Sequence, residues 1–384
     1  MTPRIASTAD LTELADQLAQ AERVAVDTEF HAERRYLPEL FLVQVQVPGA
    51  DAWVLDPLID GVIEGAAEAL RSVAWLVHGG SQDLRLMNRA LGGLPSDIVD
   101  TQIGAGLAGE RYPMGYGALV ERHLGIKLPK SATLSDWSRR PLTAEQIDYA
   151  IDDVARLPAL WAAIVGEVEA LGRTSELAAA CRDFRAYWMN EPDPRRAWSA
   201  MAAAEGMRGR SRAVLQELCA WRESTAQERN QPPRSILSDG LVIEMSKRIP
   251  SSIDAILANR RFPRSARRHV DALMGAVERG CAMPSAEHPA KVLRHTEPWR
   301  AATLLTAWAQ LLGRDRRWAP KLVLPPWVLE RLLLEAPATR EALAEVLGDW
   351  RDALVGDDLW SLWTGASTLG LDMGTGFVAE HPRR

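Results

Sequence analysis

The stretch Val24-Ala-Val-Asp-Thr-Glu-Phe30 joins the apolar pattern of a buried strand to two carboxylates. Because side chains alternate along a strand, Asp27 and Glu29 are expected to project from the same face. Two neighbouring carboxylates repel each other unless a cation lies between them, and Mg²⁺ prefers oxygen ligands of this kind. The alternative is an acidic strand end that water solvates. Matching carboxylates elsewhere in the chain would favour the metal site.

The sequence around this stretch predicts a mixed α/β domain that ends near residue 190. Apolar runs rich in β-branched residues predict strands at 23–29, 41–47, 52–56 and 74–78. The first three are expected to form a meander. Amphipathic patterns and capping residues predict helices at 8–21, 62–72 and 81–91, another opened by Asp100, and a long one from 143 to about 171 with a kink at Pro158. Early strands followed by interleaved helices are typical of an α/β domain.

Beyond a predicted linker at 191–194, the chain is expected to be almost entirely helical and to contain an internal repeat. A shift of 87 residues places Ala220-Trp221 on Ala307-Trp308 and Pro233 on Pro320. Matches of this kind in one register indicate a repeated structural unit. We predict two copies of one small all-α domain, at 207–286 and 294–373.

Composition narrows the class of protein. A chain of 384 residues has room for two or three domains of roughly 100–200 residues each. It has no apolar run of about 18 residues, so no membrane span is expected. Its three cysteines, Cys181, Cys219 and Cys281, are widely spaced, which argues against a C-x-x-C zinc site and suits a reducing cytoplasm.

Charge is divided unevenly along the chain. Residues 1–190 hold 17 Lys+Arg against 27 Asp+Glu, whereas residues 191–384 hold 28 against 24. An acidic half joined to a basic half fits a metal-using catalytic domain with a polyanion-binding partner domain. Only five of the 45 basic residues are lysines. Arginine favours phosphate through its planar donors, although this richness can also reflect genome composition.

Two further sites supply carboxylates. Asp83 falls at the start of the helix that follows Gly79-Gly80, where an acidic residue also simply favours a helix N-terminus. Tyr149 and Asp153 lie four residues apart and so share one helix face. Helical spacing alone does not choose between Asp153 and Asp152, because a residue at i+3 is also a neighbour.

These motifs, in this order, resemble the three exonuclease motifs of the DEDD superfamily, in its tyrosine-bearing branch. The resemblance is closer still to the bacterial ribonuclease D family. It covers nearly the whole chain, and the helical copies resemble the HRDC domains that follow the catalytic domain in that family. The matching stretches are Asp27-Thr-Glu-Phe30, Tyr36-Leu-Pro38, His78-Gly-Gly-Ser-Gln-Asp-Leu84, Asp100-Thr-Gln102, Lys130-Ser131, Asp136-Trp137, Arg140-Pro-Leu-Thr143 and Tyr149-Ala-Ile-Asp-Asp-Val154.

The resemblance implies an RNase H-like α/β exonuclease domain at 1–190, two HRDC domains and a two-metal mechanism. It favours Asp153 over Asp152. Two divalent ions, Mg²⁺ or Mn²⁺, can activate water and relieve charge on the leaving oxygen when carboxylates hold them. The expected holders are Asp27, which bridges both ions, Glu29 and Asp153 on the ion that carries the water, and Asp83 on the other. Tyr149 is expected to orient that water, because a phenol that titrates near pH 10 is a poor base. Lys130 is a candidate phosphate contact.

A basic cluster in the first helical copy is the candidate nucleic-acid contact. It surrounds Phe262-Pro263, and the corresponding part of the second copy is mixed to acidic. Clustering at a turn and a helix start favours phosphate binding, whereas the ordinary reading of such a cluster is a solvated face. Its arginines are Arg260, Arg261, Arg264, Arg267 and Arg268.

The predicted function is that of a 3′→5′ exoribonuclease that trims the 3′ ends of tRNA precursors and other small structured RNAs. We expect a monomer that is located in the cytoplasm and does not associate with a membrane. Two alternatives stay open. A DNA-directed 3′→5′ exonuclease would use the same metal cage, because the cage does not read the sugar. A non-catalytic RNA-binding scaffold would be expected to have lost at least one of the five site residues, and all five are present.

Overall fold

The computed structural model describes residues 4–31, 35–128, 135–190, 193–201, 207–287, 297–372 and 377–382. It forms two compact units, which are described separately. Unit 1 comprises Met1–Phe30, Leu40–Asn190 and Ala301–Arg384, and unit 2 comprises His31–Glu39 and Glu191–Arg300. The first two residues of the predicted linker 191–194 lie outside the described part of the chain.

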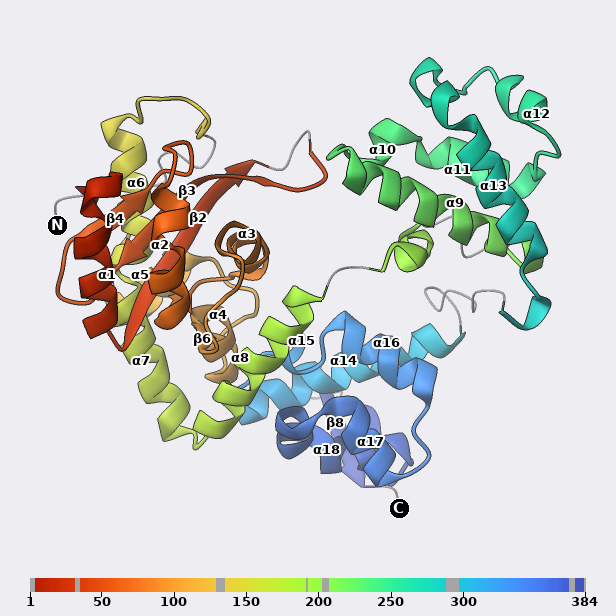
Figure 1. Cartoon of the computed structure of the whole chain (residues 1–384). Coiled ribbons are helices and arrows are strands. Elements are labelled where there is room, and N and C mark those ends of the chain that lie inside the picture. Colours follow the sequence, from red (N-terminus) through yellow and green to blue (C-terminus); the bar gives the residue numbers. More distant parts are fainter. Residues whose placement is uncertain are drawn as a thin grey trace. The chain divides into compact units, whose positions relative to one another are not determined.

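Unit 1 is built on a six-stranded mixed sheet with the order β1-β4-β3-β2-β5-β6 (Figure 1). Strand β2 lies inside the sheet between β3 and β5, and it pairs with β5 in parallel. The neighbours β2, β3 and β4 confirm the predicted meander. The strands are β1 Arg4–Ile5, β2 Arg23–His31, β3 Glu39–Gln46, β4 Ala52–Leu55, β5 Ala74–Val77 and β6 Ile98–Asp100.

Helices cover both faces of this sheet, and each face has its own apolar core. Val24 and Val26 of β2 belong to one core, together with side chains of α1, α2 and α3. Ala25 belongs to the other, together with side chains of α4 to α8. The helices are α1 Leu11–Gln20, α2 Val62–Ser72, α3 Ser81–Leu91, α4 Thr101–Leu107, α5 Tyr116–Leu124, α6 Ala144–Ala155, α7 Leu157–Ala170 and α8 Thr174–Met189.

The predicted helices 62–72 and 81–91 and the helix at Asp100 are confirmed, but the long helix after Thr143 is two. Helix α6 ends at Ala155, and Arg156, with φ −101° and ψ −5°, separates it from α7, which begins at Leu157. Pro158 lies in the first turn of α7, where the missing N–H of proline costs nothing. The predicted kink is therefore a complete break.

The remaining helices form two copies with the same order, and three matched pairs of residues are offset by 87 positions. Asn230 and Ile249 have positive φ, and so do Arg317 and Ala336. The copies are α9 Gly209–Glu228, α10 Pro233–Ile236, α11 Asp239–Arg248, α12 Ile253–Leu257 and α13 Val270–Ala282, and α14 Glu297–Arg316, α15 Pro320–Val323, α16 Pro326–Glu335, α17 Arg340–Leu347 and α18 Asp349–Trp363. Ser252 and Thr339 then cap α12 and α17 in the same way.

The second copy differs from the prediction at its end. The segment expected to be all-α to residue 373 closes with an antiparallel hairpin, β7 Ser367–Asp372 and β8 Phe377–Pro382. Leu369 and Leu371 alternate with Thr368, Gly370 and Asp372, in a pattern too short to separate a strand from a frayed helix by periodicity alone. This hairpin therefore has no clear signal in the sequence.

Candidate active site

Three carboxylates from two elements meet beside the sheet. Asp27 and Glu29 lie near the end of β2, and Asp153 lies on α6. One oxygen of each lies within 4.8 Å of the other two, which is close enough for a shared cation. Ala25 belongs to the core on the α6 side, so alternation places Asp27 and Glu29 on the face that α6 covers. The structure therefore brings together three of the carboxylates that the sequence singled out.

Asp83 reaches the site from the first turn of α3. The turn before it, Gly79-Gly80, is tight: Gly79 has φ +66°, and a Cβ on Gly80 would lie 2.8 Å from a Val77 methyl group. Asp100 accepts hydrogen bonds from both glycine N–H groups at 3.1 Å and also caps α4. Asp100 thus fixes the turn that orients α3. It is also the N-cap of α4, as the sequence indicated.

A hydroxyl holds the Asp83 carboxylate against β2. The Thr28 Oγ1 donates to Asp83 Oδ1 at 2.5 Å. Asp83 is outside the group of three that lies within 4.8 Å, but its charge acts on both Asp27 and Glu29. The four carboxylates therefore form one electrostatic group.

Helix α6 presents the tyrosine and the last carboxylate together. Thr143 and Gln146 form a reciprocal capping box that fixes its first turn. The charge of Asp153 acts on the Tyr149 hydroxyl and helps to raise its pKa. Asp152 instead forms an ion pair with Arg156 at 2.5 Å. The structure thus separates the two adjacent aspartates, which helical spacing alone could not do.

Burial raises the pKa of every carboxyl in this group, and repulsion between its members adds to the rise at Asp27 and Glu29. Burial is the main cause at Asp27, whose pKa is well above its usual range, and the charges of Asp83, Asp153 and Glu29 add to it. Burial likewise raises the pKa of Glu29 to about 8 and that of Asp153 to about 7. A bound cation would favour the ionised forms and reverse these shifts. An all-oxygen donor set of this kind fits Mg²⁺ or Mn²⁺.

Neighbouring aromatic residues enclose the group. Trp137 is buried, and its ring centroid lies 6.0 Å from that of Tyr149, so it acts as a packing residue. Tyr116 was not singled out from the sequence. Its hydroxyl donates a hydrogen bond to the Asp152 carbonyl at 3.0 Å. His78 contacts Thr101 Oγ1 at 2.7 Å, and burial lowers its pKa to about 4. His78 is therefore neutral near pH 7 and acts as a core residue.

The basic cluster belongs to unit 2. It lies on the loop after α12 and on the 3₁₀ helix Arg264–His269. A hollow of about 540 Å³ adjoins it, and Arg260 and Arg261 line that hollow together with Lys247 and Arg248. All five of its arginines, Arg260, Arg261, Arg264, Arg267 and Arg268, are exposed. Lys130, the other predicted phosphate contact, lies outside the described residues.

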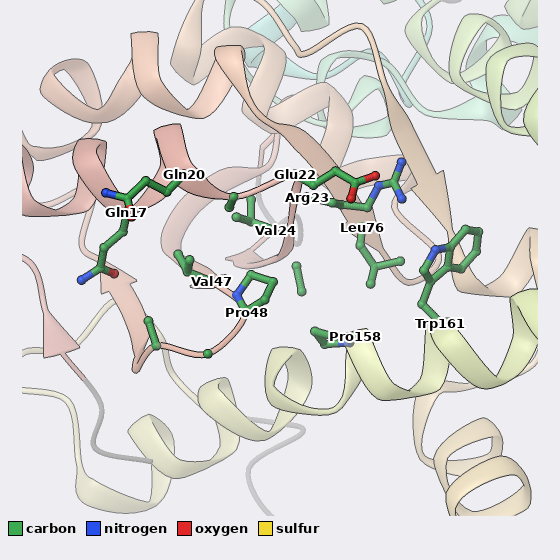
Figure 2. Close-up of a pocket in the computed structure, with 14 residues that line it drawn as sticks. Gln17, Gln20, Glu22, Arg23, Val24, Val47, Pro48, Leu76, Pro158 and Trp161 are labelled. Atoms are coloured by element: carbon green, nitrogen blue, oxygen red, sulfur yellow. The ribbon is translucent and has the colours of Figure 1, made fainter.

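One hollow of unit 1 lies away from the carboxylates. Figure 2 shows it between Trp161 and the chain around Pro48. It measures about 550 Å³ and is lined by Arg23 and Val24, at the opposite end of β2 from Glu29. No predicted site residue lines this hollow.

Among the described residues, no helix has both the length and the hydropathy needed to cross a bilayer.

Comparison with known proteins identifies relatives of both parts of the chain. A family model for 3′-5′ exonuclease domains matches residues 4–169, and a model for the HRDC domain matches residues 211–277. Ribonuclease D of Gluconacetobacter diazotrophicus is 32% identical over 377 residues, which cover 96% of this chain and 94% of that protein. Ribonuclease D of Nitrobacter hamburgensis is 30% identical over 378 residues, which cover 96% and 97%.

A solved structure shares the fold over nearly the full length. The crystal structure of Escherichia coli RNase D, described as an exoribonuclease involved in structured RNA processing, superimposes with a TM-score of 0.81. The two sequences are 26% identical, and the match covers 95% of this chain and 99% of that one.

Proposed function

This chain belongs to the ribonuclease D family of 3′–5′ exoribonucleases, and we propose that its carboxylate group holds the two divalent cations of a phosphodiester-hydrolysing site. The family uses divalent metals. The observation that supports this site in this chain is the approach of one oxygen each from Asp27, Glu29 and Asp153 to within 4.8 Å. Two bound ions would supply an activated water and would stabilise the charge that develops on the leaving 3′ oxygen.

Each residue of the site then has a separate task. Asp27 would be shared by both cations, Glu29 and Asp153 would hold the one that supplies the attacking water, and Asp83 would hold the other. Tyr149 orients that water. Its pKa is raised by burial and by the neighbouring carboxylates, so its hydroxyl keeps its proton at neutral pH and acts as a donor rather than as a base.

We propose the 3′ ends of tRNA precursors and other small structured RNAs as substrates, because the relatives are ribonucleases D and the similar Escherichia coli enzyme processes structured RNA. Lys130 and the arginines of the basic cluster are the proposed phosphate contacts. The enzyme is proposed to act as a monomer. The three cysteines are free, and Cys181 and Cys219 are buried, which supports a reducing, cytoplasmic location.

The test compares matched RNA and DNA. Purified protein is incubated with a 3′-extended tRNA and with DNA of the same sequence, in Mg²⁺, in Mn²⁺ or in a chelator. We expect stepwise loss of nucleotides from the RNA 3′ end, dependent on the metal and absent with chelator. Preferential degradation of the DNA would establish the alternative substrate. Asp27→Asn should abolish hydrolysis, and more than a few per cent of residual activity in Mg²⁺ would rule out the two-metal site.

A further inference from the structure

Thr28 lies between the two carboxylates of β2 but faces the other way. Val24 and Val26 belong to the core that also contains Leu84 and Met87 of α3. Alternation along β2 therefore turns Thr28 towards α3, on the face opposite Asp27. At this end of the strand the contact between β2 and α3 becomes polar.

The Thr28 hydroxyl makes that polar contact with Asp83. Its Oγ1 donates to Asp83 Oδ1 at 2.5 Å across 55 residues of sequence, and Thr28 is only 5% exposed. The bond favours the ionised carboxylate and opposes the rise in pKa that burial causes at Asp83. A carboxylate has two oxygens and about four lone-pair positions, so one donated bond leaves capacity for a cation.

We propose that Thr28 is a positioning residue that holds the Asp83 carboxylate in place for the second cation. This inference rests on the proposed function of the site. Asp83 stands apart from the group of three, so its orientation depends on the first turn of α3 and on this hydroxyl. Residues that hydrogen-bond to metal ligands typically change metal affinity or activity by about 10–100-fold when they are removed.

The test measures metal binding without turnover. Mn²⁺ is titrated calorimetrically into chelator-stripped full-length protein, with Thr28→Val and Thr28→Ala removing the hydroxyl and Thr28→Ser keeping it. Valine preserves the size and the β-branched shape of threonine, and alanine cannot clash. We expect two Mn²⁺ sites in the wild type and in Thr28→Ser. In Thr28→Val and Thr28→Ala one site should weaken by about 10–100-fold while the other is unchanged.

A double variant separates positioning from a general structural role. If Thr28 acts through Asp83, adding Thr28→Val to Asp83→Asn should weaken Mn²⁺ binding no further than Asp83→Asn alone. Wild-type Mn²⁺ binding by Thr28→Val, binding by Thr28→Ser as weak as that by Thr28→Val, or additive losses in the double variant would overturn the inference. Failure of the proposed function would look different, because the wild type itself would then lack the second site.

Discussion

Glu29 makes the stability of the metal-free protein depend on pH. Its pKa is about 8 in the folded protein, against an ordinary 4.5. The folded state therefore holds this proton more tightly than the unfolded state does. As pH rises from about 4.5 to 8, the unfolded state gains from ionisation and the folded state loses stability. In chelator, we expect the urea midpoint of the wild type to fall between pH 5 and pH 8.

Glu29→Gln removes this ionisable group and serves as the matched comparison. Between pH 5 and pH 8 in chelator, the urea midpoint of Glu29→Gln should fall less than that of the wild type. Mg²⁺ at pH 8 should raise the midpoint of the wild type more than that of the variant, because the ion binds ionised carboxylates of the folded state. Parallel pH profiles for the two proteins would contradict the assigned burial of Glu29.

Tyr149→Phe tests water positioning without removing a carboxylate. The hydroxyl lies close enough to Asp153 for that carboxylate to raise its pKa, and positioning by a side chain typically contributes about 10²–10⁴ in rate. We expect single-turnover cleavage to slow within that range while Mn²⁺ and RNA affinities stay at wild-type values. Wild-type turnover by Tyr149→Phe would leave the hydroxyl without a role in the reaction.

Residue identity predicted much of the site but not its fine arrangement. The spacing in Asp27-Thr-Glu29 required a shared face, and the structure places both carboxylates there with Asp153. The choice of Asp153 over Asp152 came from the family resemblance, and the Asp152–Arg156 ion pair now supplies its physical reason. The bond from Thr28 to Asp83 could not be foreseen, because it joins elements whose contact only the tertiary fold decides.

At the scale of single elements, the basic cluster offers the clearest test. Each phosphate contact releases counterions, so its loss should flatten the salt dependence of binding by about one unit of slope. We expect changing Arg260, Arg261 and Arg264 together to alanine to weaken RNA binding and to flatten that slope. Single-turnover cleavage at saturating RNA should stay near normal, because the carboxylate group belongs to unit 1. Titrations at several salt concentrations measure both effects.

The control removes the same charge elsewhere in unit 2. Arg196, Arg210 and Arg234 are also exposed, and none of them lines the hollow beside the cluster. Changing these three to alanine should leave the slope closer to the wild-type value. Equal slopes for the two triple variants would mean that the cluster is only a solvated face and that RNA is held elsewhere.

Elements were predictable where one pattern determines them. The 3.6-residue pattern located α2 and α3, although Ser81, which could cap the second of them, is its first helical residue and Gly80 takes the cap position. Strand β3 was located as well, but its alternation suggests one solvated face, whereas Gln44 and Gln46 are 0% and 4% exposed. Helices cover both faces of this sheet, and local sequence does not reveal a second covering layer. The three-residue strand β6 is too short for any periodicity.

At the scale of the whole molecule, the two helical copies have different places. The first copy lies in unit 2, but the second is part of unit 1. One apolar core contains Ile164 and Phe184 of the exonuclease domain together with Trp308 and Leu322 of the second copy. The repeat in the sequence predicts two like domains, but it does not say which of them merges with the catalytic domain.

Polar contacts reinforce this shared core. Arg351 of α18 is 1% exposed and donates to Asp183 of α8 at 2.5 Å. Its guanidinium carbon also lies 4.6 Å from the ring centroid of Trp327 and 4.2 Å from that of Trp350. A buried charge without such partners would be costly, so the second copy is fixed to the exonuclease domain. Removing it would open the catalytic core, and a point substitution therefore tests this junction more sharply than a truncation does.

Gly106 of α4 provides that substitution. A Cβ at this position would lie 2.7 Å from Leu322 Cδ2, and the Gly106 carbonyl accepts from the Ala319 N–H at 2.7 Å. Gly117 of α5 has nothing within 4 Å of the same position. We expect Gly106→Ala to destabilise unit 1 by about 1–3 kcal/mol through overpacking. Gly117→Ala should be neutral or stabilising by up to about 1 kcal/mol, because alanine favours helix. Urea unfolding, followed by tryptophan fluorescence, measures both changes in stability. Equal urea midpoints for the two variants would show that the second copy does not pack tightly against α4.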